Sequence, residues 1–192
     1  SARVTQRQRV RDELFEHLRK LRLDISRKQG VPPYIVFNDA TLEEMAATKP
    51  KYESDMMDIN GVSHVKMGRY GRQFLDAIQT FIAEKAGEGI KEKGSTYLLT
   101  LQLYRQGLST DEIAVKRDIA PTTVFSHLAT LYEKGENIKL TSFVTKAEIK
   151  RVLDVIKDME SPFKMKEIFE ALEEQVEYGK IRMALAYYNR RK

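Results

Sequence analysis

Apolar residues recur along this chain with a helical period of three to four residues almost throughout. A first helix from about residue 5 to 28 is predicted by one apolar stripe, made of Leu14, Leu18, Leu21 and Ile25. The same period predicts further helices at about 41–48, 51–57, 64–85, 95–106, 109–117, 121–135, 145–159, 164–175 and 178–190. No strand-like alternation runs for more than a few residues. The sequence therefore predicts an all-α protein.

A short glycine-containing segment divides the pattern into two parts. Gly87, Gly89 and Gly94 alternate there with charged residues. This composition is typical of a flexible linker at a domain boundary. We therefore expect a helical bundle at 1–86, a flexible linker at 87–94 and a second helical domain at 95–192.

The charge is modest and unevenly spread. Of the net +5, residues 1–86 carry +3, residues 87–140 carry 0 and residues 141–192 carry +2. Contacts with nucleic acid are then expected to be local and weak. The absence of Cys excludes disulfides and thiolate zinc sites and fits a cytosolic protein. No apolar run approaches the roughly 18 residues of a membrane helix, so we expect no membrane contact. The first residue is Ser rather than Met, which favours a piece of a longer protein.

Catalytic chemistry has little support in the sequence. The glycine cluster at 87–94 lacks the Lys of a phosphate-binding loop. His17, His64 and His127 are far apart and show no metal-ligand spacing. Carboxylates occur mostly in the spacing of helical ion pairs. We therefore expect no catalytic site, metal or cofactor in this chain.

The segment 31–37, Val-Pro-Pro-Tyr-Ile-Val-Phe, is the most informative motif. The two prolines end one helix, and Thr41 with Glu44 has the spacing of a capping box that starts the next. Together with Asn-Gly-Val at 60–62 and Tyr-Gly-Arg-Gln-Phe-Leu at 70–75, the motif resembles the HRDC domain of RecQ-type DNA helicases and of ribonuclease D. The resemblance covers roughly residues 10 to 85.

Candidate nucleic-acid contacts in this half follow from that resemblance. It implies that Tyr34 contacts single-stranded DNA, and a ring on a rigid turn suits base stacking. The alternative is that Tyr34 packs beside Phe37 at the edge of the core. The turn around Gly61 resembles a helix-hairpin-helix, with backbone N–H groups and the side chains of Lys66, Arg69 and Arg72 facing a phosphate. The alternative is a structural turn followed by a solvated basic face.

Residues 109–131 resemble a helix-turn-helix, most closely the one that follows HRDC in some bacterial RecQ proteins. Ser109 and Glu112 have capping-box spacing, as do Thr145 and Glu148 farther on, and Pro121 suits a first helical turn. A winged-helix-like fold is an alternative for this domain. Groove-facing positions are predicted for Thr122, Thr123, Ser126 and His127. Since no Arg, Asn or Gln stands among them, we expect sequence-tolerant DNA contact or a protein contact.

A weak internal repeat links two helix pairs of the second domain. Ile113, Val124, Leu128 and Leu131 correspond in spacing to Ile168, Ile181, Leu185 and Tyr188, with two extra residues in the turn. Duplication is one interpretation, and ordinary amphipathic patterning is the other.

The two resemblances together imply the C-terminal accessory region of a RecQ-family, ATP-dependent DNA helicase. Such a parent would carry ATP, Mg and Zn sites upstream and act in recombination and repair in the bacterial cytoplasm, at the nucleoid. This region would hold single-stranded or junction DNA, weakly and with sequence tolerance. The alternatives are an RNA-guiding tail of a ribonuclease-D-like exonuclease, a helix-turn-helix transcription regulator, and a protein-docking module.

Overall fold

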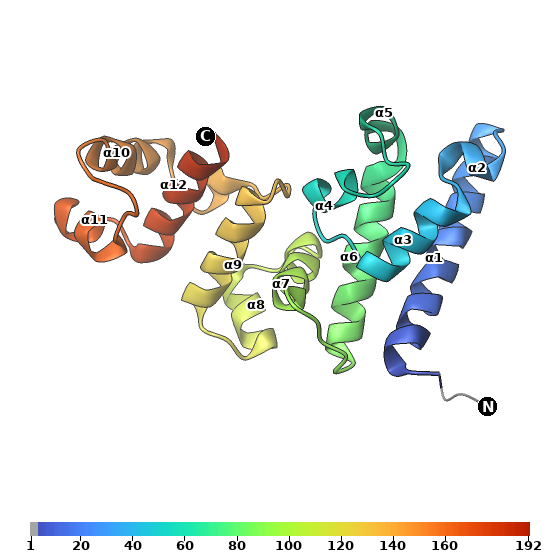
Figure 1. Cartoon of the computed structure of the whole chain (residues 1–192). Coiled ribbons are helices and arrows are strands. Elements are labelled where there is room, and N and C mark those ends of the chain that lie inside the picture. Colours follow the sequence, from blue (N-terminus) through green and yellow to red (C-terminus); the bar gives the residue numbers. More distant parts are fainter. Residues whose placement is uncertain (1–3) are drawn as a thin grey trace. The chain divides into compact units, whose positions relative to one another are not determined.

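The structure, a computed structural model, describes residues 4–192, which divide into two compact units, residues 4–95 and 96–192 (Figure 1). Each unit is built of helices, and residues 4–192 contain no β-strand. The predicted all-α class is therefore confirmed, and the second unit lacks the β-hairpin of a winged helix. Within the same residues no helix combines the length and the hydropathy that a membrane span requires.

The first unit contains one long helix at each end and short helices between them. Its elements are α1 (Gln6–Gln29), α2 (Pro33–Val36), α3 (Asp39–Thr48), α4 (Glu53–Met57), α5 (His64–Lys66), the π-helical turn η1 (Met67–Gly71) and α6 (Arg72–Gly87). The helix predicted at 64–85 is present as the continuous run α5–η1–α6. The one-turn helix α2 was not predicted, because four residues are too few to show a helical period.

The core of the first unit lies where α1 and α3 pack against each other and where α1 meets α6. Leu14, Leu18, Phe74 and Ile78 are fully buried there. Phe37, also fully buried, meets Phe74 edge to face with ring centroids 5.0 Å apart. The segment after the Pro-Pro pair is thus anchored in the core through its last residue.

The capping box predicted for Thr41 and Glu44 is wrong. Helix α3 begins two residues earlier, and Asn38 caps it by accepting a hydrogen bond from the Thr41 N–H at 2.8 Å. Thr41 Oγ1 instead donates to the Asn60 carbonyl at 2.8 Å, and Glu44 Oε2 accepts from the Asn60 N–H at 3.0 Å. Both side chains therefore hold the distant turn around Gly61, which has a φ of 91°. A Cβ at Gly61 would come within 2.3 Å of Thr41 Oγ1, so this turn requires glycine.

The segment 87–94 is tied to the first unit at several points, among them Glu88, which pairs with Lys85 at 3.3 Å, and Ile90, whose N–H bonds the Lys85 carbonyl at 2.8 Å. Glu92 forms ion pairs of 2.9 Å with both Lys49 and Lys51. Burial alone would raise the pKa of Glu92, but the hydrogen bonds from Lys51 and Lys49 outweigh burial and hold this pKa below its ordinary value. The flexibility expected of residues 87–94 stays a prediction, and so does their role as a linker.

The second unit consists of six α-helices and a 3₁₀ turn. They are α7 (Ser95–Arg105), α8 (Thr110–Arg117), α9 (Pro121–Glu133), η2 (Leu140–Ser142), α10 (Lys146–Ile156), α11 (Met165–Ala171) and α12 (Tyr178–Arg190). The capping boxes predicted at Ser109 with Glu112 and at Thr145 with Glu148 are both formed.

The internal repeat corresponds to two helix pairs, α8–α9 and α11–α12. Ile113 and Ile168 are fully buried in the first helix of each pair, and so are Val124 and Ile181 in the second. The second helices, α9 and α12, pack directly against each other. Duplication stays a hypothesis, but the matched positions serve the same role in both pairs.

Candidate nucleic-acid interface

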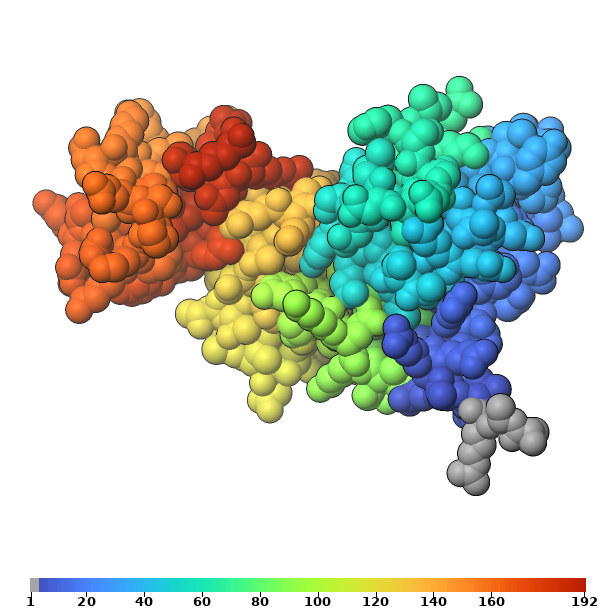
Figure 2. Space-filling view, viewed as in Figure 1, coloured from blue at the N-terminus to red at the C-terminus, as the bar shows by residue number. Residues whose placement is uncertain are grey.

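The one-turn helix α2 displays Tyr34 at the surface of the first unit. Pro33 occupies the first helical position, where its missing N–H costs nothing. The Tyr34 side chain follows and is 64% exposed, while Val36 and Phe37 at the end of the turn are fully buried. This segment, light blue in Figure 2, lies on the open surface of its unit. Tyr34 is therefore not part of the core rim beside Phe37, and its face is available to a base.

A buried arginine fixes this turn. Arg22 of α1 is 9% exposed, and its Nη1 donates to the Phe37 carbonyl at 3.0 Å and pairs with Asp39 Oδ1 at 2.7 Å. The Ile35 N–H bonds the Pro32 carbonyl at 3.0 Å. Because Arg22 holds the end of the turn and the Ile35–Pro32 bond closes it, the turn loses little further entropy when a ligand binds.

Phe37 joins the Tyr34 turn to the basic turn that follows Gly61. Lys66 Nζ lies 5.7 Å from the centre of the Phe37 ring, within the range of a cation–π contact. Tyr70 meets the same ring edge to face at 6.2 Å and donates its hydroxyl to Gln29 Oε1 of α1 at 3.0 Å. The basic turn thus packs against Phe37, the buried residue that follows the Tyr34 turn.

The three predicted cations differ in what they can offer a phosphate. Arg69 is exposed and has no hydrogen bond or ion pair in the part of the chain that the structure describes. Lys66 is half-buried over Phe37. Arg72 pairs with Asp76 at 2.7 Å and donates to Gln79 at 3.3 Å, so its charge is already matched within its own helix. Arg69 is therefore the best placed of the three to meet a phosphate.

The start of α5 is capped from within the chain. Ser63 Oγ accepts from the Lys66 N–H at 3.1 Å and thereby acts as the N-cap of α5. One of the backbone donors expected to face a phosphate is thereby already used.

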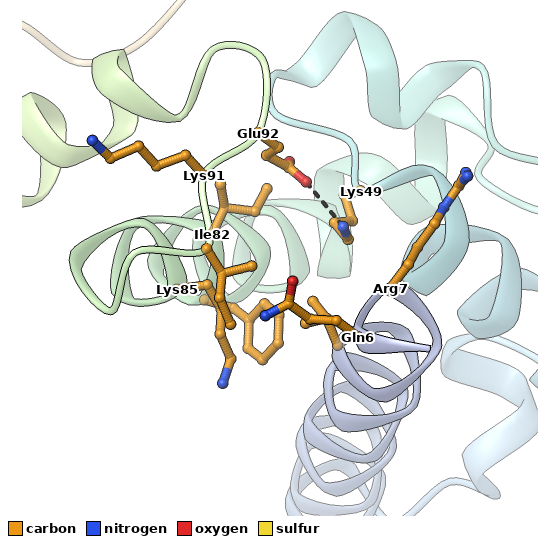
Figure 3. Close-up of a pocket in the computed structure, with 10 residues that line it drawn as sticks. Gln6, Arg7, Lys49, Ile82, Lys85, Lys91 and Glu92 are labelled. Atoms are coloured by element: carbon orange, nitrogen blue, oxygen red, sulfur yellow. Dashed lines mark hydrogen bonds and ion pairs between the residues drawn. The ribbon is translucent and has the colours of Figure 1, made fainter. Parts of the chain in front are cut away.

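The first unit also contains a basic hollow that has no signal in the sequence. It encloses about 180 Å³ and includes Arg7, Lys49, Lys85 and Lys91 in its lining. Figure 3 shows Arg7, Lys85 and Lys91 pointing away from one another, while Lys49 pairs with Glu92. Lys85 pairs with two carboxylates, and the hydrogen bond that it donates to Glu13 is the main cause that raises the pKa of Lys85. These cations do not converge on one point, so the hollow does not form an anion site.

In the second unit, only part of the predicted groove-facing set is accessible. Thr122 and Ser126 are exposed on α9, and Thr123 is half-buried. Phe125 packs against Phe143, with ring centroids 5.8 Å apart, and against Gly179 of α12. Arg182 of α12 also pairs with Glu133 of α9. Helix α12 therefore covers one side of α9, and the open side offers hydroxyl groups without charge.

The predicted groove-facing position of His127 is wrong, because its side chain is only 9% exposed. Its ring lies 4.8 Å from the Tyr97 ring, and its Nδ1 is 2.9 Å from Thr100 Oγ1. Arg117 Nη1 donates to that hydroxyl at 2.5 Å, so the hydroxyl proton is directed to Nδ1. His127 thus accepts this bond as a neutral imidazole and joins α7 to α9.

Acid should destabilise the second unit through His127. Burial first, and then the charge of Arg117, lower the pKa of His127 below its ordinary value of about 6.5. Below that ordinary value the unfolded chain takes up a proton that the folded unit does not, so stability falls as the pH falls. We expect the melting temperature of the second unit to fall between about pH 7 and 5.5. His127→Asn should flatten this dependence, while His64→Asn in the first unit should leave it unchanged. An equally steep dependence in His127→Asn would contradict the assignment.

Within residues 4–192 no three side chains of His, Asp or Glu are grouped closely enough to hold a metal ion. The accessible features are an exposed aromatic ring, a free arginine and a hydroxyl-bearing helix face. These features are of kinds that can contact nucleic acid, because a ring can stack on a base and an arginine or a hydroxyl can meet a phosphate.

Comparison with known families identifies both halves of the chain. Residues 11–78 match the HRDC domain, and residues 96–185 match a helix-turn-helix domain. The chain therefore carries an HRDC domain followed by a helix-turn-helix domain, and the resemblance seen in the sequence is confirmed.

The similar proteins are helicases. The ATP-dependent DNA helicase RecQ of Bacillus subtilis is 47% identical over 70 residues, which are 36% of this chain and 12% of that protein. RecQ of Haemophilus influenzae is 51% identical over 67 residues, 35% of this chain and 11% of that protein. The ATP-dependent helicase wrn-1 of Caenorhabditis elegans is 25% identical over 164 residues, 76% of this chain and 16% of that protein. The chain thus spans only a small part of each relative.

Proposed function

We propose that this chain is the C-terminal accessory region of a RecQ-family, ATP-dependent DNA helicase, and that it holds single-stranded or junction DNA for the motor. The observation that supports this most is the exposed Tyr34 on a turn held by Arg22, in a domain of the HRDC family that also carries the exposed, unpaired Arg69. A base would stack on Tyr34, and the neighbouring phosphates would meet Arg69 and Lys66.

This binding is weak and sequence-tolerant in our proposal. No side chain on the open face of α9 can form the bidentate contacts that distinguish bases, and Thr122 and Ser126 suit phosphate oxygens instead. The helix-turn-helix domain therefore adds contacts to the phosphate backbone of DNA, while the HRDC domain supplies Tyr34 for base stacking.

The catalytic steps belong, in this proposal, to an upstream core of the same polypeptide. That core would bind ATP, Mg and Zn, and this chain alone would hydrolyse no ATP. The whole protein would act in recombination and repair in the cytoplasm, associated with the nucleoid. ATP hydrolysis by the isolated chain would contradict the assignment of ATP hydrolysis to the upstream core.

The salt dependence of DNA binding tests the proposed interface. Arg69→Gln should lower the slope of log K against log salt for a single strand by about 0.7, because one phosphate contact is lost. Arg72→Gln is the matched control: its charge is paired with Asp76, so the slope should hardly change. Titrations of a fluorescent oligothymidylate at several salt concentrations would give both slopes. Equal slopes for wild type and Arg69→Gln would show that Arg69 makes no phosphate contact.

The earlier alternatives predict different preferences. A ribonuclease-D-like tail would bind RNA in preference to DNA of the same sequence, and a transcription regulator would select one duplex sequence. Competition among single-stranded DNA, RNA and mixed duplexes separates these cases from the proposal.

A further inference from the structure

The second unit contains a groove whose floor is aliphatic. It encloses about 500 Å³ between the end of α9, the turn η2, and helices α10 and α12. Its floor is formed by Ile138, Leu140, Ile149 and Leu153. Leu153 is half-buried, while the other three are buried. A space of this size accepts one or two bulky apolar side chains.

The rim of the same groove is positively charged. Lys146 and Lys150 stand one turn apart on α10, and Arg191 follows α12. Lys146 has no hydrogen bond or ion pair among residues 4–192, and Lys150 reaches only Asp154, at 3.7 Å and with its side chain 81% exposed. None of the described residues that line the groove is acidic. An apolar occupant with negative charges beside it would complement both features.

The aromatic side chains at the groove favour a peptide over a nucleic acid. Tyr132 and Tyr187 line it, but a guanidinium group lies over one face of each ring. Arg190 lies 4.4 Å from the centre of the Tyr132 ring, and Arg191 lies 4.0 Å from that of Tyr187. Stacking of bases needs open aromatic faces. What remains accessible is the aliphatic floor, which suits leucine or phenylalanine side chains.

We propose that this groove docks a short acidic segment of a partner protein that carries one or two bulky apolar side chains. The apolar side chains fill the space above Leu153 and Ile149, and the carboxylates lie against Lys146, Lys150 and Arg191. This site is separate from the Tyr34 surface, and its test does not depend on DNA binding by the HRDC domain.

The test uses a fluorescein-labelled peptide of sequence Asp-Asp-Asp-Leu-Asp-Asp-Leu-Phe and the full chain. Fluorescence anisotropy should show binding that weakens with added salt. Lys146→Glu should weaken it roughly tenfold, because a rim cation becomes a repelling anion. Lys166→Glu changes the net charge equally on α11, outside the groove, and should leave binding unchanged. Leu153→Asn should abolish binding, because it places a polar side chain in the aliphatic floor. The melting temperature of this variant checks that it is folded.

Two control peptides and one oligonucleotide complete the experiment. Replacing every Asp with Ser, or every Leu and Phe with Ser, should abolish binding of the peptide. Peptide binding that is the same in wild type, Lys146→Glu and Leu153→Asn would overturn the proposal. A labelled oligothymidylate that loses affinity in these two variants, while the peptide fails to bind, would assign the groove to nucleic acid instead.

Discussion

Tyr34→Ala is expected to weaken binding of single-stranded DNA by about 1–3 kcal/mol, roughly five- to 150-fold in Kd. The Tyr34 ring lies on a turn that is held by the hydrogen bond from Arg22 to the Phe37 carbonyl. Removing the ring therefore deletes a stacking face without breaking this bond. Because the side chain is 64% exposed, the melting temperature should hardly change.

Anisotropy of a labelled oligothymidylate and thermal denaturation of the same samples measure the two effects. Tyr34→Phe is the matched control, since it keeps the ring and should keep most of the affinity. Ile35→Ala, an exposed neighbour without a ring, should have little effect. If Tyr34→Ala lowers the melting temperature by several degrees and leaves affinity unchanged, Tyr34 is structural and the proposed stacking site is wrong.

Phe74→Ala should destabilise the first unit by about 3–5 kcal/mol and leave the second unit intact. Phe74 is fully buried against Phe37, so its removal leaves a cavity and exposes the anchor of the Tyr34 turn. The second unit has a core of its own, which includes Ile113, Val124 and Ile181. Hydrogen exchange followed residue by residue should therefore show lost protection in the helices of the first unit only.

Phe74→Leu provides the graded control, because it keeps most of the apolar volume and should cost less than the alanine variant. Loss of protection in both units together would show that the chain unfolds as one cooperative body. That result would also contradict the expected independence of the two halves across 87–94.

Features that depend on near neighbours in the sequence were predicted correctly. The helical segments and their order follow from the apolar period. The capping boxes at Ser109 and Thr145 were also correct, because each joins residues only three positions apart. The same spacing failed at Thr41 and Glu44, where Asn60 competes for both side chains from nearly twenty residues away. Spacing alone does not reveal such a competitor.

By itself, then, the sequence determined two all-α parts, the HRDC and helix-turn-helix resemblances, and the candidate aromatic ring on the Pro-Pro turn. The tertiary structure decided which candidate residues are accessible. It leaves Tyr34 and Arg69 open, pairs Arg72 with Asp76, and buries His127 beside Thr100. The physical reason is that a helical period identifies the apolar face of a helix, but polar side chains are exposed or buried according to partners on other elements. The aliphatic groove beside α10 has the same origin, because its floor and rim come from segments that only the fold brings together.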